Sequence, residues 1–456
     1  MPLSIDGRDF SSLHFAGIMG SGMSAIAQYL AWEGLAISGS DRIAFADEMK
    51  GTKEPLEQCG CLLYPQDGSG ITPATGALVI STAIEDDNPD IAAARKCGIP
   101  IVHRSDALAA IVASHRTIAV CGTSGKSTVT ALVFEILRAC GKHPSVISGA
   151  NLIRLNDEGL LGNAFRSDSD TLVIEADESD GTLVKYRPEK AVFLNISKDH
   201  QSVIQALGLF EQLAGQTPWV IKNGDDPGLK SIRAAHQFGL LQGAECRPEA
   251  VKAVTPSVQF TLKGTDIELP MPGYHNLSNA LAALCVCESE GCQLERMVEP
   301  LREFRGVLRR FSVSRTPMGV TIIDDYAHNP DKIKAAILTA RDFGARIFAV
   351  FQPHGYGPTR FLKDELVVIF SLHLRDIDEV HFLPIYYAGG TVKKDISSED
   401  LADRIRERGI KSYAPHNRKE LLTDLKQRVK PGDAVILMGA RDPTLSLLAQ
   451  EIRNNL

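Results

Sequence analysis

A lysine and a hydroxyl group follow a short glycine-containing loop in the segment GTSGKST, residues 122–128. An apolar run of strand character, residues 117–121, precedes this loop, and apolar residues at helical spacing follow it. Strand, glycine loop, lysine, hydroxyl and helix occur in this order in phosphate-binding loops, where backbone N–H groups and the helix dipole hold phosphate oxygens. We expect Lys126 to bridge the β- and γ-phosphates of ATP and Ser127 to hold Mg²⁺ or Mn²⁺. The alternative is a capped turn at a helix start.

Two apolar runs end in acidic or metal-binding side chains, as strands do at the carboxyl edge of a parallel sheet. TLVIEADESDG, residues 171–181, contains Glu175 followed by three more acids, and AVFLNISKDH, residues 191–200, ends in Asp199 and His200. Beside a phosphate loop, Glu175 and His200 are candidate metal ligands. A solvated acidic turn and a structural histidine are the alternatives.

Two asparagines and a pair of arginines could contact a nucleotide. Asn276 and Asn279 are three residues apart at the predicted start of a helix, so they share one face,. An asparagine amide can pair with the N6/N7 edge of adenine, although one of the two could be a helix N-cap. In the string RRF, residues 309–311, one guanidinium could neutralise charge on a transferring phosphoryl group, although arginine pairs are usually solvated.

A second glycine turn lies near the N-terminus. Residues 13–41 predict strand, glycine turn, helix and strand, and Asp41 falls where a ribose-binding acid would lie,. Met19 stands where a dinucleotide fingerprint needs glycine. The pattern therefore favours a diphosphate on the N-terminus of the following helix over a dinucleotide.

Further strands alternating with helical stretches predict an α/β chain of three domains. These are a Rossmann-like N-terminal domain, a central P-loop ATPase-type α/β domain and a Rossmann-like C-terminal domain, with expected bounds at residues 1–112, 113–312 and 313–456,. The predicted strands that define the first and third domains lie near residues 76–82, 99–104, 319–326, 346–353, 379–386 and 433–439.

Composition excludes several classes of function. The chain has 456 residues, a net charge of −7 and no stripe of basic residues interleaved with aromatics, so we expect no nucleic-acid partner,. No apolar run reaches membrane-spanning length, and the first residues lack the pattern of a secretory signal,. We therefore expect no membrane partner and a cytoplasmic location.

Over its whole length the chain resembles the Mur ligases of peptidoglycan synthesis. The strings that carry the resemblance occur in the order GIMGSGM, SGSD, VISTAIEDDNP, GTSGKST, EADESDG, NISKDH, PGYHNLSNALAA, RRF, DDYAHNP and FQPH. The resemblance is greatest to the members that add L-alanine to UDP-N-acetylmuramate. It implies an ATP-dependent, ADP-forming ligase that activates the lactyl carboxylate as an acyl phosphate, acting as a monomer or homodimer.

The resemblance also implies a role for individual residues. The catalytic residues would be Lys126, Glu175, His200 and Arg310, and the metal ligands would be Ser127, Glu175 and His200. ATP would contact Gly122, Thr123, Ser124, Gly125, Lys126, Ser127, Thr128, Asn276, Asn279, Arg310 and Asp325. The UDP-sugar would contact Gly20, Ser21, Gly22, Asp41 and Ser81, and the amino substrate would contact Tyr326, His354, Tyr356 and Arg360.

One stretch departs from the family pattern where the amino component should bind. FQPHGYGPTRF places Gly355 and Pro358 at two positions where the L-alanine-adding members carry basic residues. Another amino acid, or a preassembled peptide attached during cell-wall recycling, is therefore an open alternative. Alternatives of another class are a non-catalytic nucleotide-binding protein and an NAD-dependent oxidoreductase built on the first domain.

Overall fold

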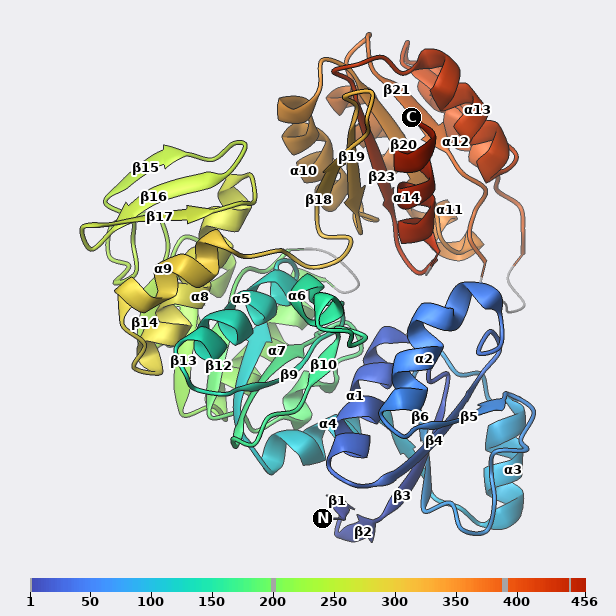
Figure 1. Cartoon of the computed structure of the whole chain (residues 1–456), viewed down its shortest axis with the longest axis vertical. Helices are drawn as coiled ribbons and strands as arrows, with labels where there is room; N and C mark the ends of the chain where they lie inside the picture. Colours follow the sequence, from blue (N-terminus) through green and yellow to red (C-terminus); the bar gives the residue numbers. More distant parts are fainter. Residues whose placement is uncertain (1, 198–201, 388–392, 443) are drawn as a thin grey trace. The chain divides into compact units, whose positions relative to one another are not determined.

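The computed structural model describes residues 2–197, 202–387, 393–442 and 444–456. The chain divides into two compact units, Met1–Val307 and Leu308–Leu456 (Figure 1). Both are built on largely parallel sheets covered by helices. The prediction of an α/β fold with parallel sheets is confirmed. Among the described residues, no helix is long and apolar enough to cross a membrane.

The N-terminal part of the first unit is a parallel sheet with strand order β5-β4-β3-β6-β7, preceded by the hairpin β1–β2. Its strands are β1 (Leu3–Ile5), β2 (Arg8–Phe10), β3 (Ser12–Ala16), β4 (Ala36–Asp41), β5 (Leu62–Pro65), β6 (Ala77–Ile80) and β7 (Ile101–His103). Its helices are α1 (Ser21–Trp32), η1 (Asp47–Met49), α2 (Lys50–Gln58), α3 (Pro89–Cys97) and α4 (Arg104–Ala113). Apolar residues of β3 alternate between the two faces: Phe15 packs with α1 and α4, and Ala16 packs with α3,.

The central sheet has the strand order β10-β9-β11-β8-β12-β13-β14 and is parallel except for β10. Its strands are β8 (Arg116–Cys121), β9 (Ser145–Ile147), β10 (Ala164–Phe165), β11 (Thr171–Ala176), β12 (Lys190–Phe193), β13 (Trp219–Asn223) and β14 (His236–Phe238). The helices of this part are α5 (Lys126–Ala139), α6 (Ile153–Asp157), η2 (Thr182–Lys185), α7 (Val203–Gly215), η3 (Pro227–Leu229), α8 (Tyr274–Ser289) and α9 (Leu294–Arg302).

The two faces of the central sheet pack differently. Helices α5, α8 and α9 cover one face, while the other shares a continuous apolar core with α7 and with the first sheet. This shared core explains why the two sheets belong to one unit. The predicted boundary between residues 112 and 113 stays a prediction.

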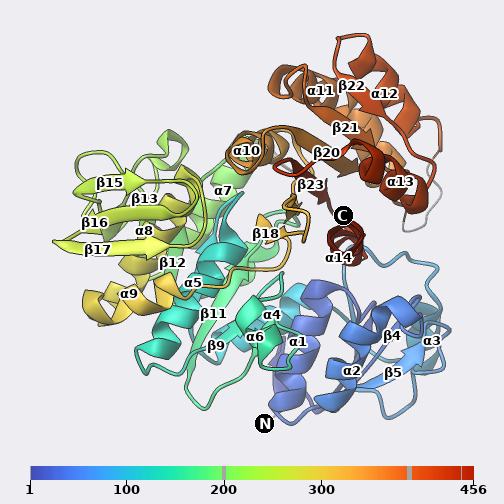
Figure 2. The same ribbon diagram turned by 45° about the horizontal axis from the view of Figure 1, so that its top comes forward.

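A small antiparallel sheet, which the sequence analysis did not predict, extends the central part. Its strands β15 (Ala250–Ala253), β16 (Val258–Leu262) and β17 (Thr265–Leu269) lie beside α8 and α9 (Figure 2). Apolar residues alternate with polar ones along β16, as expected for a sheet with one buried face,.

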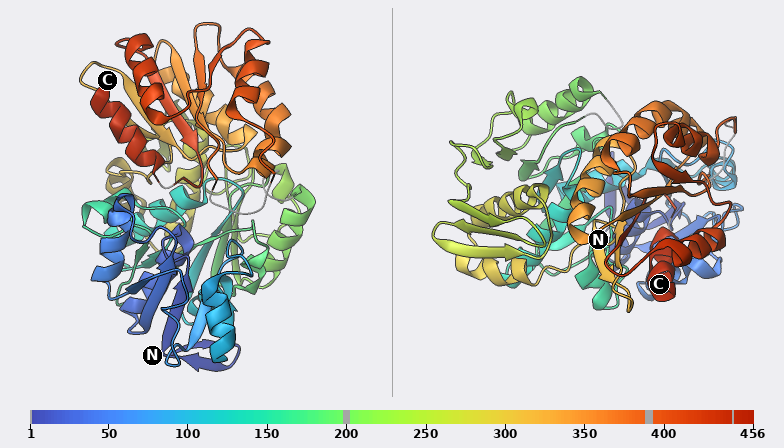
Figure 3. Two further views of the ribbon diagram at one scale, coloured as in Figure 1. Left: turned by 90° about the vertical axis from the view of Figure 1, so that its right-hand side faces the viewer. Right: turned by 90° about the horizontal axis from the view of Figure 1, so that it is seen from above.

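The second unit is a doubly wound sheet with strand order β18-β19-β23-β20-β21-β22, antiparallel only at β18. Its strands are β18 (Ser312–Arg315), β19 (Thr321–Asp325), β20 (Ile347–Gln352), β21 (Glu379–Phe382), β22 (Lys411–Tyr413) and β23 (Ala434–Gly439). Its helices are α10 (Pro330–Ala340), η4 (Arg341–Phe343), α11 (Tyr356–His373), α12 (Ser398–Arg406), α13 (Arg418–Arg428) and α14 (Leu445–Asn455). Apolar side chains of α10, α11 and α12 pack on one face and those of α13 and α14 on the other (Figure 3).

Helix α5 carries a buried carboxylate that makes folding pH-dependent. Glu135 is 4% exposed, and burial raises its pKa to about 7 despite its ion pair with Arg154 at 2.9 Å. The Oε1 atom of Glu135 has no hydrogen-bond partner among the described residues. The folded protein therefore takes up a proton between pH 4.5 and 7 that the unfolded chain does not bind,.

We predict that Glu135→Gln raises the free energy of unfolding at pH 8 by up to about 3 kcal/mol, the equivalent of this pKa shift. Because the folded pKa is raised, wild-type stability falls as pH rises through this window, whereas the glutamine variant has no charge to bury. The difference should vanish near pH 4.5. Urea unfolding followed by circular dichroism measures it, with Glu57→Gln, on a half-exposed carboxylate of α2, as the control. A variant that is less stable than the wild type at pH 8 would contradict the prediction.

Candidate active site

The glycine loop between β8 and α5 is built from two residues that need glycine. Gly122 has φ 150° and Gly125 has φ 87°, both in the region that favours glycine,. A Cβ atom on Gly125 would lie 2.6 Å from Oδ1 of Asn279, and one on Gly122 would lie 3.0 Å from Cβ of Leu194. The backbone therefore turns tightly enough to aim its N–H groups at a phosphate, with α5 starting at Lys126,.

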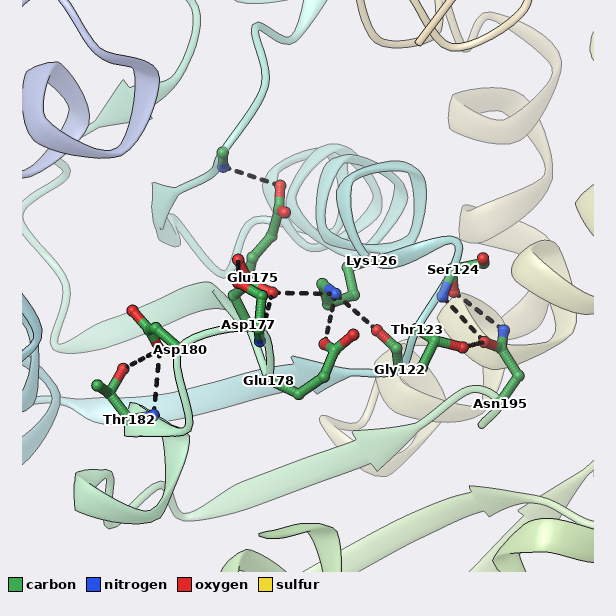
Figure 4. A network of polar contacts seen from close by, with 12 residues as sticks. Gly122, Thr123, Ser124, Lys126, Glu175, Asp177, Glu178, Asp180, Thr182 and Asn195 are labelled. Atoms are coloured by element: carbon green, nitrogen blue, oxygen red, sulfur yellow. Dashed lines mark hydrogen bonds and ion pairs between the residues drawn. The ribbon is translucent and has the colours of Figure 1, made fainter. Parts of the chain in front are cut away.

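Asn195, a residue that the sequence analysis did not single out, braces this loop (Figure 4). Its Oδ1 accepts hydrogen bonds from the Ser124 amide at 2.9 Å and the Thr123 hydroxyl at 3.0 Å, and its Nδ2 donates to the Ser124 carbonyl at 3.0 Å. The signal was available in the sequence, because Asn195 closely follows the apolar strand β12, as Glu175 ends β11. A rigid brace of this kind fixes the loop before any nucleotide arrives.

The amine of Lys126 is held at the start of α5 by three acceptors (Figure 4). It donates to the Gly122 carbonyl at 2.7 Å and to Glu178 at 2.6 Å, and it lies 3.5 Å from Asp177. Burial alone would lower the pKa of Lys126, but the charges of Asp177 and Glu178 outweigh it, so the pKa is raised. The Asp177 side chain is half-exposed; desolvation would raise its pKa, but Lys126 and the hydrogen bonds from Ser179 lower that pKa to about 2. The amine is therefore charged at neutral pH.

Glu175 lies at the end of β11, where the sequence pattern placed it. Its Oε1 accepts hydrogen bonds from the Ser148 hydroxyl at 2.5 Å and the Gly149 amide at 2.9 Å. Ser127 is a buried residue in the first turn of α5. Both offer oxygen ligands, which Mg²⁺ prefers, so they fit such an ion. His200 lies outside the described residues, and no set of three or more His, Cys, Asp or Glu side chains within the described ranges is placed to hold an ion.

The two asparagines of α8 are buried and belong to the wall of the loop. Asn276 donates to the Pro272 carbonyl at 2.8 Å, and Asn279 donates to Oδ1 of Asn276 at 3.1 Å. The N-cap of α8 is Gly273, so neither asparagine caps the helix. Asn279 therefore shapes the turn at Gly125, and its contact with adenine stays a prediction.

At the first glycine turn, Asp41 orders the backbone. Its Oδ2 accepts a hydrogen bond from the Met19 amide at 3.1 Å, and its Oδ1 accepts one from the Ile43 amide at 3.2 Å. Burial raises the pKa of Asp41, and the backbone hydrogen bonds oppose that shift. Gly20 is the N-cap of α1, so Gly20, Ser21 and Gly22 lie at the helix start as expected. Their contact with a UDP-sugar, and that of Ser81, stays a prediction.

In the second unit, Arg309 has a structural role. Arg309 binds Asp324 at 3.2 Å and the Gly439 carbonyl at 2.6 Å. The guanidinium of Arg310 lies 4.9 Å from the ring centroid of Tyr326. Asp325 accepts hydrogen bonds from two backbone amides, Phe311 at 2.8 Å and Ala327 at 2.7 Å, so it shapes the turn before α10. The contacts of Arg310 and Asp325 with ATP stay predictions.

Of the residues predicted for the amino substrate, His354, Tyr356 and Arg360 lie at the start of α11, and Tyr326 directly follows β19. The rings of His354 and His328 are 5.6 Å apart, and Tyr356 lies 5.3 Å from Tyr387. Arg360 is bound to Asp395 through Nε at 2.8 Å, so its charge is already compensated. His354 and Tyr356 are two residues apart in the chain. Their role toward an amine stays a prediction.

A surface hollow of 460 Å³ lies at the opposite edge of the central sheet from the glycine loop. It is lined by residues at the amino ends of the strands, including Arg116 and Glu189. Arg116 binds Glu189 through both Nε at 3.0 Å and Nη2 at 2.8 Å. This ion pair compensates the charges of both side chains, and the candidate site is the glycine loop.

Comparisons with known proteins agree with this assignment. The model of the Mur ligase family catalytic domain matches residues 12–116, that of the Mur ligase middle domain matches residues 120–287, and that of the Mur ligase glutamate ligase domain matches residues 309–441. Together the three matches fit the expected three-domain layout.

Whole proteins match over nearly the full chain. UDP-N-acetylmuramate–L-alanine ligase of Pelotomaculum thermopropionicum is 34% identical over 450 residues, covering 94% of this chain and 95% of the relative. The crystal structure of UDP-N-acetylmuramate–alanine ligase from Thermotoga maritima aligns with a TM-score of 0.79 at 26% identity, covering 97% and 98% of the two chains. A murein peptide ligase from Psychrobacter arcticus shares the fold, with a TM-score of 0.70 at 19% identity over 97% and 98% of the chains. By sequence and by fold, the chain belongs to the Mur ligase family.

Proposed function

We propose that this protein joins L-alanine to the lactyl carboxylate of UDP-N-acetylmuramate and converts ATP to ADP and phosphate. The reaction is a step of peptidoglycan synthesis, placed in the cytoplasm. The observation that carries the proposal is the charged amine of Lys126 at the preformed glycine loop. The match of the whole chain to UDP-N-acetylmuramate–L-alanine ligases supports the choice of substrates.

The reaction needs a phosphoryl transfer because a carboxylate has a poor leaving group. A lactyl carboxylate oxygen attacks the γ-phosphorus of ATP, the bond to the β-phosphate oxygen breaks, and ADP leaves. The resulting acyl phosphate is then attacked at its carbonyl carbon by the neutral amine of alanine. Phosphate leaves with the former carboxylate oxygen, and the amine loses a proton as the amide forms.

The residues of the loop act mainly by position and charge. The backbone amides at the start of α5 would face the phosphates, and Lys126 would compensate the charge that moves from the γ-phosphoryl group to ADP,. Ser127 and Glu175 would hold Mg²⁺, with His200 as the ligand of a second ion. A bound Mg²⁺ supplies positive charge that neutralises the phosphate oxygens. Asn195 keeps the loop in the phosphate-binding shape throughout.

The proposal distributes the substrates over the chain. Residues 1–112 are assigned to the UDP-sugar, residues 113–312 to ATP and residues 313–456 to the amino component.

The two alternatives of another class lack support at specific residues. An oxidoreductase leaves the loop at Lys126 without a role, and Lys126 together with the candidate metal ligands Ser127 and Glu175 favours phosphoryl transfer over nucleotide binding alone.

We predict that Lys126→Met lowers kcat for phosphate release at least about 100-fold, because one charged donor to the phosphoryl group is lost. The measurement uses ATP, Mg²⁺, UDP-N-acetylmuramate and L-alanine with detection of phosphate. Lys230→Met, at an exposed lysine, should keep wild-type turnover. Full turnover in Lys126→Met would refute the proposed mechanism.

The amino component is tested separately, because Gly355 and Pro358 stand where the L-alanine-adding members carry basic residues. We predict that L-alanine gives the highest kcat/KM for phosphate release among the proteinogenic amino acids and the peptide L-alanyl-γ-D-glutamyl-meso-diaminopimelate. Each amine is supplied with the same ATP and UDP-N-acetylmuramate. A preference for the peptide would replace L-alanine as the substrate while keeping the ligase chemistry.

A further inference from the structure

The acidic loop after β11, residues 177–181, is closed by its own hydrogen bonds. Asp177 accepts from the Ser179 amide at 3.2 Å and the Ser179 hydroxyl at 3.0 Å, and the Gly181 amide donates to the Glu178 carbonyl at 3.0 Å. Asp180 accepts from the Thr182 amide at 3.1 Å (Figure 4). These hydrogen bonds hold residues 177–182 together as one local unit.

Two acids of this loop bind two cations of the first unit. One cation follows a strand of the central sheet, and the other follows a strand of the N-terminal sheet. Glu178 binds Lys126 at 2.6 Å, at the central glycine loop. Asp180 binds Arg104 at 2.8 Å, and the Asp180 side chain is 7% exposed. Arg104 is the first residue of α4, which follows the N-terminal sheet.

Arg104 also lies against the glycine turn at the start of α1. A Cβ atom on Gly22 would be 3.0 Å from Nη1 of Arg104, so the guanidinium lies close to the backbone of this turn. The guanidinium thus lies at the amino ends of α1 and α4, where helix dipoles favour anions and oppose cations,. Asp180 supplies the compensating anion in this structure, and the diphosphate of a sugar nucleotide would compete for the same guanidinium.

We propose that Arg104 and Asp180 are positioning residues that couple sugar-nucleotide binding to the Lys126 site. The diphosphate draws Arg104 from Asp180, the acidic loop shifts, and Glu178 releases the amine of Lys126 to the triphosphate. The inference rests on the proposed function, because it needs a UDP-sugar at the Gly20–Gly22 turn and ATP at the central loop. The inference adds a coupling between sugar-nucleotide binding and ATP binding that neither glycine turn provides by itself.

Isothermal calorimetry of the full-length protein tests the link with UDP-N-acetylmuramate, Mg²⁺ and a non-hydrolysable ATP analogue. We expect the analogue to bind the wild type about tenfold more tightly when the sugar nucleotide is present, with the same factor in the reverse order. Asp180→Asn keeps an acceptor for Thr182 but loses Arg104. It should bind the analogue alone as tightly as the wild type does with sugar nucleotide, so its coupling factor falls to about one.

Two further variants separate the link from general damage. The double variant Arg104→Met/Asp180→Asn should have the same coupling factor as Asp180→Asn alone. This result is expected in a double-mutant cycle when both residues act through the same ion pair. Lys185→Met removes another ion pair between η2 and α4, with Asp106, and should keep the tenfold factor. If thermal unfolding shows that Asp180→Asn is not folded, Arg104→Lys takes its place. Arg104→Lys keeps the positive charge but loses the planar guanidinium fork.

The outcomes distinguish this inference from the proposed function. An unchanged factor in Asp180→Asn, an equal loss in Lys185→Met, or a factor of one in the wild type overturns the link while both ligands still bind. Absence of binding of either ligand to the wild type overturns the proposed function itself.

Discussion

The candidate site depends on the parallel pairing of β8 with β11. Glu175 pairs with Val120 and Ala176 with Cys121, so both strands end at the same level of the sheet. The glycine loop and the acidic loop therefore leave the sheet side by side, and the amine of Lys126 meets Glu178. A register slip by one residue would turn the acidic side chains to the other face and leave a buried ammonium ion unpaired.

The local part of this arrangement could be predicted from sequence. Gly122, Gly125, Lys126 and Ser127 lie within six consecutive residues, so the chain itself fixes their spacing. Glu175 was found by a second local rule, because it ends an apolar strand. The fold class followed in the same way from alternating strands and helices.

The partners of residues that act across long separations could not be predicted, even where, as for Asn195, a position just after an apolar strand marks the residue itself. Asn195 reaches the glycine loop from a position 71 residues away from Ser124, and Asp180 reaches Arg104 across 76 residues. Which strands neighbour each other decides these contacts, and no spacing in the sequence encodes it.

The ion pairs of the acidic loop also bear on how ATP affinity arises. Without nucleotide, Lys126 keeps its charge because Glu178 and Asp177 compensate it inside the protein. A triphosphate must replace these partners, so the measured affinity is the difference between two strong interactions of the same amine. Anything that weakens the internal partners strengthens ATP binding without touching the nucleotide. For that reason the acidic loop, rather than the glycine loop that Asn195 holds rigid, is the element through which a second substrate can adjust the first.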